Sequence, residues 1–371
     1  MKENILILED SSKAKFGGGQ KVTLEVMEAL HNNYNLVLVD CNKKSIFQEK
    51  ANNFISDFIE LNCNGKVVGG DKSSFGLGYF EILLFPILLI KNIFSLGRCI
   101  NDSKFNNKNT IIYATTKKNI LLAYALKKLF NINYIYHAHS FDDRSSFFYK
   151  IINPAYKKAK KIMCVSNLIK NNIKLNNCQT VYNPIEIINT NPKKIDNKDK
   201  IIIATFSTLI KWKGVEYFMK SFDYLENKQK VEYWIFGEGQ EKEYLQQFEN
   251  DKVILKGFVN NSEELMLNEI DIVVVPSITE EACPMVPLEA FKCAIPVIST
   301  NIGGQAEIVL DNKVGCFVNI KDSEAIANKI DSLIDDPDKY NKLSENAIEY
   351  SKKFDSNIYK QNILKIFKEF N

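Results

Sequence analysis

The sequence predicts an α/β protein with two doubly wound, mostly parallel sheets, one in each half of the chain. Short apolar runs alternate with segments of helical periodicity, and this alternation is typical of parallel strands joined by helices. The alternation stops in a polar stretch after residue 185 and starts again at Ile201. With 371 residues, the chain is long enough for two domains of ordinary size, each with its own core.

Residues 1–185 hold five apolar runs of strand length, and a glycine-rich turn follows the first of them. The runs lie at 5–8, 36–39, 110–113, 134–136 and 162–165. Gly17, Gly18 and Gly19 open a helix expected from about Lys21 to Leu30. Such a turn lets a ligand approach the backbone, and the helix N-terminus favours negative charge. The spacing is not Gly-x-Gly-x-x-Gly and no Walker lysine follows, so a surface loop without a ligand remains the alternative.

Two of the three histidines, His137 and His139, stand at the carboxyl end of the run at 134–136. They are two residues apart and share one face if the strand continues. No third histidine or cysteine lies nearby in the sequence, which disfavours a metal site. A cleft-edge histidine that hydrogen-bonds a substrate fits better, and satisfied structural histidines remain the alternative.

Residues 186–200 are rich in Asn, Asp, Lys and Pro with little periodicity, which is typical of an interdomain linker. The second domain is expected at residues 201–350, with strands at 201–206, 233–236, 253–255, 270–275 and 295–299. Lys213 precedes a helix expected at 215–223, where a cation and free backbone amides can meet a phosphate together. A last helix at 351–371 has an apolar face and is a candidate to pack back on the first domain.

The loop at 276–290 carries the clearest functional signal. It follows the apolar run at 270–275, and ligands of α/β sheets bind beyond the carboxyl ends of the strands. Glu281 and Glu289 stand eight residues apart in it, and acceptor-only carboxylates suit a ligand rich in hydroxyls, such as a sugar or a ribose. Taken alone, the two residues also fit a helix cap and a solvated helix position.

Composition excludes several functions. The net charge is only +3 and Arg98 and Arg144 are the only arginines, which argues against a nucleic-acid binder. The eight cysteines contain no Cys-x-x-Cys pair, so reduced thiols in the cytoplasm are expected rather than a zinc site or a disulfide framework. The N-terminus does not have the pattern of a signal peptide.

The most apolar segment, at 80–96, contains an uninterrupted run of only nine residues from Ile82 to Ile90. A bilayer span needs about 20 apolar residues, so this segment is not expected to cross a membrane. A buried helix is favoured, and a helix at a membrane interface, with Lys91 and Arg98 near lipid phosphates, is the alternative.

Over most of its length the sequence resembles glycosyltransferase family 4, a group of retaining enzymes with the two-domain GT-B architecture. In the second half the resemblance is carried by Lys213-Gly214, Gly237-Glu238-Gly239, the Glu281 to Glu289 spacing, Pro296-Val297-Ile298 and Gly303-Gly304 with Glu307. In the first half the glycine turn, His137 and His139, Val165-Ser166 and Tyr182-Asn183-Pro184 match more loosely. The resemblance implies two Rossmann-like domains that face a central cleft, with the acceptor side on the first domain and the nucleotide sugar on the second.

The resemblance also implies roles for individual residues. Catalysis would rest on His139, Lys213 and Glu281: Lys213 neutralises the diphosphate and Glu281 contacts the donor sugar. Glu289 would bind the nucleotide ribose. The other donor-binding residues would be Gly18, Gly19, Ser207, Gly237, Cys283, Pro284, Met285 and Val286, with His137, Lys211 and Asn183 as secondary candidates.

One departure from the family pattern concerns the diphosphate. Family members usually carry Gly-Arg where this chain has Ser207-Thr208, so a bidentate phosphate contact is missing unless Lys211 replaces it as a point charge. Cys283-Pro284 also stands in place of the usual Phe-Gly, so the donor sugar cannot be inherited by analogy.

The implied function is transfer of a hexosyl or N-acetylhexosaminyl unit, with retention, from a nucleotide diphosphate sugar. UDP-sugars are favoured over GDP-sugars, and no metal or other cofactor is expected. The acceptor would be a glycan or lipid-linked saccharide of bacterial surface polysaccharide (O-antigen, capsule or exopolysaccharide), met in the cytoplasm or at the inner face of the plasma membrane. A nucleotide-sugar epimerase of the same fold and a non-catalytic nucleotide-binding module remain the alternatives.

Overall fold

The computed structural model describes residues 2–11, 16–61, 79–101, 105, 108–196 and 198–369. The chain divides into two compact units. The first comprises Met1–Tyr182 together with Tyr359–Asn371, and the second is Asn183–Ile358. Both are α/β units with a parallel sheet, and the predicted fold class is confirmed.

The sheet of the first unit has seven strands in the described residues, in the order β3-β2-β1-β4-β5-β6-β7, and every pairing is parallel. Its strands are β1 (Asn4–Leu8), β2 (Asn35–Asp40), β3 (Asp57–Glu60), β4 (Thr110–Ala114), β5 (Asn133–Ala138), β6 (Lys161–Cys164) and β7 (Cys178–Thr180). The strand order reverses between β1 and β4, which is the topological switch point where α/β sheets bind ligands. The two edge strands, β3 and β7, were not predicted; they are short and largely part-exposed.

The helices of the first unit begin with clear sequence signals. They are α1 (Gly18–Leu30), α2 (Ile46–Ala51), α3 (Tyr79–Asn101), α4 (Lys117–Phe130), α5 (Phe147–Lys158) and α6 (Asn167–Ile173). The hydroxyls of Thr116, Ser146 and Ser166 cap α4, α5 and α6 by accepting a hydrogen bond from a backbone N–H three residues on.

The second unit repeats this architecture around a six-stranded parallel sheet, in the order β10-β9-β8-β11-β12-β13 among the residues described. Its strands are β8 (Ile201–Phe206), β9 (Val231–Phe236), β10 (Val253–Gly257), β11 (Ile272–Val275), β12 (Val297–Thr300) and β13 (Gly315–Val318). Its helices are α7 (Val215–Ser221), α8 (Lys242–Leu245), α9 (Ser262–Asn268), α10 (Met285–Lys292), α11 (Gly303–Ile308), α12 (Ser323–Ile334) and α13 (Pro337–Ser351).

The segment predicted as a linker, residues 186–200, packs on the second unit where it is described. Ile195 is buried in the core of that unit. The Lys193 backbone N–H donates to Ser344 Oγ over 2.7 Å, and the Lys198 ammonium pairs with Asp271 at 2.5 Å. Asp271 is itself buried at the start of β11 and accepts a hydrogen bond from the Ile202 N–H. These contacts make the segment part of the second unit rather than a free tether.

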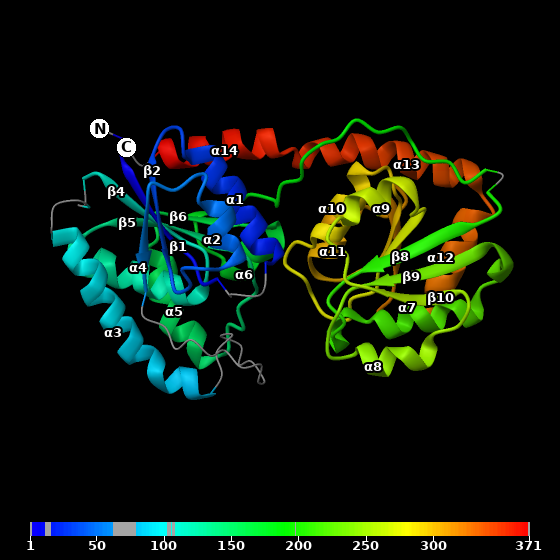
Figure 1. Ribbon diagram of the computed structural model, residues 1–371, viewed down its shortest axis with the longest axis horizontal. Helices are drawn as coiled ribbons and strands as arrows, with labels where there is room; N and C mark the ends of the chain where they lie inside the picture. The colour runs from blue at the N-terminus through cyan, green and yellow to red at the C-terminus, as the bar shows by residue number, and fades with distance from the viewer. Residues whose placement is uncertain are drawn as a thin grey trace. The chain divides into compact units, whose positions relative to one another are not determined.

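The helix at the end of the chain, α14 (Ser356–Lys368), contributes to the core of the first unit. Tyr359, Ile363, Ile366 and Phe367 are buried there. The Phe367 ring makes edge contacts with Tyr34 and Tyr113, and the Lys360 ammonium pairs with Glu25 and Glu28 of α1. The ribbons of α14 and α1 lie side by side in Figure 1.

The apolar segment at 80–96 forms part of α3, and its side chains before residue 86 lie outside the described part of the chain. Ile87, Ile90 and Phe94 are 52%, 53% and 68% exposed, so the expectation of a buried helix is wrong for these three residues. They recur at helical spacing and form one exposed stripe, while Leu96 and Ile100 are buried. No helix among the described residues reaches the length and hydropathy of a membrane span.

Replacing Phe367 with alanine should destabilise the first unit by about 3–5 kcal/mol, because the change removes a fully buried ring and leaves a cavity. The exposed Lys365 of the same helix is the matched control, and Lys365→Ala should shift stability by less than about 0.5 kcal/mol. Urea unfolding followed by circular dichroism measures both. Equal effects of the two substitutions would show that α14 is not part of the core.

Candidate functional site

The turn that carries Lys213 is fastened to the loop after β11. After β8 the chain makes one 3-10 turn, Lys211–Lys213, and Gly214 follows with φ of +65°. A Cβ at Gly214 would lie 2.1 Å from the carbonyl oxygen of Pro276, so only glycine fits. The Ile278 N–H donates to the Trp212 carbonyl over 2.9 Å. The close approach of the two segments brings Lys213 to the loop at 276–290.

Lys213 and Glu281 form an ion pair, with 2.6 Å between Lys213 Nζ and Glu281 Oε2. The other carboxylate oxygen of Glu281 accepts hydrogen bonds from Ser277 Oγ at 2.6 Å and from Gln305 Nε2 at 3.2 Å. Both members of the pair are only partly exposed, so solvent screens their attraction less than at an open surface. The site thus holds one cation and one carboxylate in fixed positions at the carboxyl edge of the sheet.

The backbone between Glu281 and α10 is held from two sides. The Gly304 N–H donates to the Glu281 carbonyl over 2.6 Å, and a Cβ at Gly304 would lie 2.5 Å from the Ala282 carbonyl oxygen. Asn183 Nδ2 donates to the Cys283 carbonyl over 3.1 Å. Burial raises the pKa of the Cys283 thiol to about 12, so this cysteine stays protonated at neutral pH and is not a nucleophile.

The remaining predicted residues of this loop lie around the start of α10. Pro284 is buried and caps the helix, Met285 and Val286 open its first turn, and Glu289 follows in the second turn, partly buried. Lys211 lies exposed in the same 3-10 turn as Lys213. The structure therefore brings Asn183, Lys213, Glu281 and Cys283 together around one loop of the second unit.

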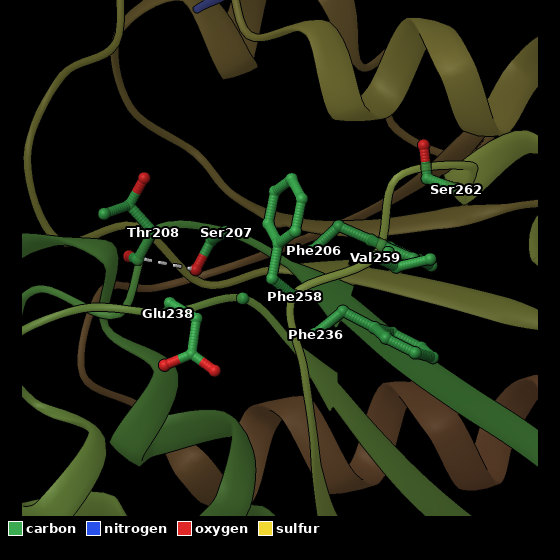
Figure 2. Close-up of a pocket in the computed structure, with 9 residues that line it drawn as sticks. Phe206, Ser207, Thr208, Phe236, Glu238, Phe258, Val259 and Ser262 are labelled. Atoms are coloured by element: carbon green, nitrogen blue, oxygen red, sulfur yellow. Dashed lines mark hydrogen bonds between the residues drawn. The ribbon is translucent and has the colours of Figure 1, made fainter. Parts of the chain in front are cut away.

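A separate pocket of about 220 Å³ in the second unit contains the predicted residues Ser207 and Gly237 (Figure 2). It opens at the carboxyl ends of β8 and β9, and its other lining residues are Phe206, Thr208, Phe236, Glu238, Phe258, Val259 and Ser262. The rings of Phe206 and Phe236 are stacked, with 4.7 Å between their centroids. Phe258 is exposed and projects beside them in Figure 2. Neither Lys213 nor Glu281 lines this pocket.

The first unit contains a polar pocket of about 310 Å³ at the switch point between β1 and β4. It is lined by Glu9, Asp10, Gly17, Gly19, Gln20, Thr23, Thr115, Thr116 and His139. Gly18 stands between two lining residues as the first residue of α1. A Cβ at Gly17 or Gly19 would meet no atom within 4 Å, so packing among the described residues does not require glycine at either position.

The two histidines predicted at this edge have different environments. His137 is fully buried, and its Nδ1 lies 2.7 Å from the hydroxyl of Tyr113. His139 lines the pocket, and its buried Nε2 has no hydrogen-bond partner. Burial lowers the pKa of His139 to about 4 and that of His137 well below its usual value, so both rings are neutral at pH 7. His139 is therefore a hydrogen-bonding group and not a cation.

Sequence analysis missed Glu9, which forms the floor of this pocket. Glu9 is 5% exposed and follows β1 directly. Its carboxylate accepts hydrogen bonds from Thr23 Oγ1 and from the Asp10 N–H, each at 3.1 Å. Burial raises the pKa of Glu9 to about 7, and the nearby carboxylate of Asp40 adds to the rise. The sequence signal that could have identified Glu9 is the pair of acidic residues, Glu9 and Asp10, immediately after an apolar strand.

No group of three or more His, Cys, Asp or Glu side chains that could hold a metal ion occurs in the part of the chain that the structure describes.

Neutralising Glu9 should change how stability depends on pH. The pKa of Glu9 is higher in the folded protein than the reference value of 4.5, so the wild type loses stability relative to Glu9→Gln as pH rises from 4.5 through about 7. The difference in unfolding free energy should grow by about 3 kcal/mol in favour of the variant. His137 and His139 contribute equally to the pH dependence of stability in both proteins, so their contributions cancel in the difference. Urea unfolding at pH 5 and pH 8 tests this, and a difference independent of pH would contradict it.

Comparison of the sequence with known proteins finds glycosyltransferases. Residues 187–350 match the family described as glycosyl transferases group 1. Glycosyltransferase MJ1178 of Methanocaldococcus jannaschii is 26% identical over 58% of this chain and 61% of its own length. The capsular polysaccharide biosynthesis glycosyltransferase CapM of Staphylococcus aureus is 27% identical over 60% of this chain and 59% of its own length. The alignments thus span about three fifths of these relatives.

The crystal structure of Anabaena HepE in complex with UDP matches the whole of both chains, with a TM-score of 0.79 at 20% identity. HepE has also been solved with UDP-glucose. Residues 187–350 are thus similar to the group 1 glycosyltransferases, and the likeness to HepE shows that the chain has the GT-B fold over both units.

Proposed function

We propose that this protein is a retaining glycosyltransferase that moves a sugar from a nucleotide diphosphate sugar to a glycan or lipid-linked saccharide. The observation that carries the proposal is the Lys213–Glu281 pair, held at the carboxyl edge of the sheet in a group 1 glycosyltransferase domain. The pair offers a cation for a diphosphate and a carboxylate for sugar hydroxyls.

In this proposal, Lys213 stabilises the charge that develops on the leaving diphosphate. This interaction is stronger in the transition state than in the ground state, so it accelerates the chemical step. Glu281 keeps the Lys213 ammonium in place and presents its carboxylate to the donor sugar, while Ser277 and Gln305 fix the carboxylate's orientation. The acceptor hydroxyl attacks from the sugar face that the diphosphate leaves, which retains the anomeric configuration. Glu289, in the second turn of α10, is assigned to the ribose.

The proposed donor is a UDP-hexose or a UDP-N-acetylhexosamine. HepE, which shares the fold, has been solved with UDP and with UDP-glucose. The pocket between Ser207 and Phe258 has aromatic walls and a volume of about 220 Å³, which suits a flat nucleobase. We assign the leaving charge to Lys213 and backbone amides, and propose that turnover needs no metal.

The proposed setting is bacterial surface polysaccharide synthesis at the cytoplasmic face of the membrane. The name of CapM places that relative in capsular polysaccharide biosynthesis. The exposed stripe of Ile87, Ile90 and Phe94 on α3, with Lys91 and Arg98 beside it, has the chemistry of a helix that lies in a lipid interface. A peripheral enzyme of this kind would meet lipid-linked acceptors at the surface.

Substituting either member of the ion pair should abolish most of the activity. For Lys213→Ala and Glu281→Ala we expect kcat to fall about 100-fold or more, the size seen when one preorganised charge-stabilising group is removed. UDP release from a panel of UDP-sugars, measured in excess EDTA, gives the rates. Lys220 and Glu216 form a partly exposed pair on α7 in the same unit, so Lys220→Ala is the matched control and should keep full activity.

Other outcomes of this assay would overturn parts of the proposal. Activity that is lost in EDTA and restored by manganese would contradict metal independence. Formation of an epimerised UDP-sugar without acceptor would identify an epimerase. UDP binding without turnover of any donor would identify a binding module.

Removing the exposed stripe should release the protein from anionic vesicles. For Ile90→Ser with Phe94→Ser we expect the fraction that sediments with phosphatidylglycerol vesicles to fall at least about tenfold, because two exposed apolar side chains no longer enter the interface. Ile320 is an exposed isoleucine of the second unit, and Ile320→Ser should sediment like the wild type. Wild-type binding that ignores both lipid charge and salt would contradict membrane contact through this helix.

A further inference from the structure

The pocket of the first unit is built from three strand ends and one helix start. Glu9 and Asp10 follow β1, Thr115 and Thr116 follow β4, and His139 follows β5. Gly17 to Thr23 bring in the first turns of α1. Three neighbouring parallel strands therefore aim polar side chains into one cavity at the switch point of the sheet. Cavities of this size and position bind small molecules.

The polar atoms of the cavity have unused hydrogen-bonding capacity. The Glu9 carboxylate has three hydrogen-bond partners, the Asp10 N–H, Thr23 Oγ1 and the Thr115 hydroxyl, while its two oxygens offer about four acceptor positions, so one remains for a ligand. His139 Nε2 is buried and has no partner. A buried nitrogen without a partner is costly, and a ligand hydroxyl that reaches it would remove that cost. Gly17 and Gly19 leave the wall beside these groups open.

The charges around the cavity favour an uncharged ligand at its floor. Glu9 and Asp10 are carboxylates, and no lysine or arginine is among the described lining residues. Lys118 is paired with Asp10 at 2.8 Å and offsets only that charge. Asp40 is buried and its carboxylate raises the pKa of Glu9, Tyr113 is a further ionisable neighbour of Glu9, and His137 and His139 are neutral. The N-terminus of α1 attracts anions with about half a charge, which is less than a full carboxylate.

We propose that this pocket holds an uncharged, hydroxyl-bearing sugar unit of the acceptor and disfavours phosphorylated sugars, with Glu9 accepting a hydrogen bond from a sugar hydroxyl beside His139. The interpretation of the ligand as an acceptor rests on the transferase function proposed above. Glu9 is then the specificity residue of the acceptor side: above its pKa of about 7, its carboxylate binds hydroxyl donors and repels a second anion. Glu9 stands at the end of strand β1 and not in a loop, so the sheet fixes the position of its carboxylate.

Ligand-observed saturation-transfer NMR tests the pocket without any turnover. The probes are methyl α-glucoside, methyl α-mannoside and methyl β-galactoside, compared with glucose 6-phosphate, mannose 6-phosphate and galactose 6-phosphate. We expect at least one methyl glycoside to bind the wild type, and more tightly than its 6-phosphate. Its dissociation constant should rise about tenfold in Glu9→Gln, as for loss of a hydrogen bond to a charged group, while the 6-phosphates gain affinity.

Two variants separate binding from folding. Glu49→Gln is the control for a removed carboxylate, because Glu49 is an exposed residue of α2 that does not line the pocket. This variant should bind the glycoside like the wild type. Gly19→Ala should weaken glycoside binding at an unchanged melting temperature, since the added methyl group meets only open space.

The proposal falls if no methyl glycoside binds, if the 6-phosphates bind more tightly, or if Glu9→Gln changes neither class. A failed donor assay with intact, Glu9-dependent glycoside binding would overturn the transferase function and leave the sugar pocket standing. An active transferase whose glycoside binding ignores Glu9 would overturn the pocket assignment alone.

Discussion

Parallel strand pairing is the constraint on which the rest of this structure depends. Every strand pair within the two described sheets is parallel, so the loops that follow the strands gather at one edge of each sheet. Segments that are far apart in the sequence are therefore neighbours at that edge because of the strand order alone. Lys213, after β8, reaches Glu281, after β11, and Glu9, after β1, shares a cavity with His139, after β5. Helices capped by serine and threonine cover the faces and leave this edge to polar groups.

The electrostatics of the two sites differ because their surroundings differ. Glu281 has a lysine, a hydroxyl and a side-chain amide as partners. Glu9 has a hydroxyl and a backbone amide, and a second carboxylate lies nearby, so its pKa is raised to about 7. Burial and a neighbouring carboxylate thus make Glu9 a group that titrates near neutral pH.

The sequence alone predicted the fold class and most of the strands, because a strand buried on both faces is a run of apolar residues wherever it occurs. It did not predict β3, β7 or β13, because polar residues in β3 and β7 and a glycine at the start of β13 interrupt the apolar run that marks a strand. The prediction that α3 is buried was wrong for its exposed stripe, because hydropathy does not show which face of an apolar helix packs against the protein. Glu9 was missed because its burial is created by Thr23, Asp40 and Thr115, which come from other elements. The roles proposed for Lys213, Glu281 and Glu289 rest on the family resemblance, and their spacing in the sequence does not reveal the ion pair between Lys213 and Glu281.

The position of α14 gives the chain an unusual assembly order. The core of the first unit includes Tyr359, Ile363 and Phe367, so the second unit is inserted, in sequence, into the first. During synthesis on the ribosome, residues 2–182 would emerge with the hydrophobic surface under α14 still uncovered. The second unit, being continuous in sequence, can fold before the first is complete. The segments that enter and leave the inserted unit bond to each other, Ile185 N–H to the Phe354 carbonyl and Ser356 N–H to the Ile185 carbonyl. Those two bonds lie at the start of α14, so the segment that completes the first unit is joined directly to contacts that close the second.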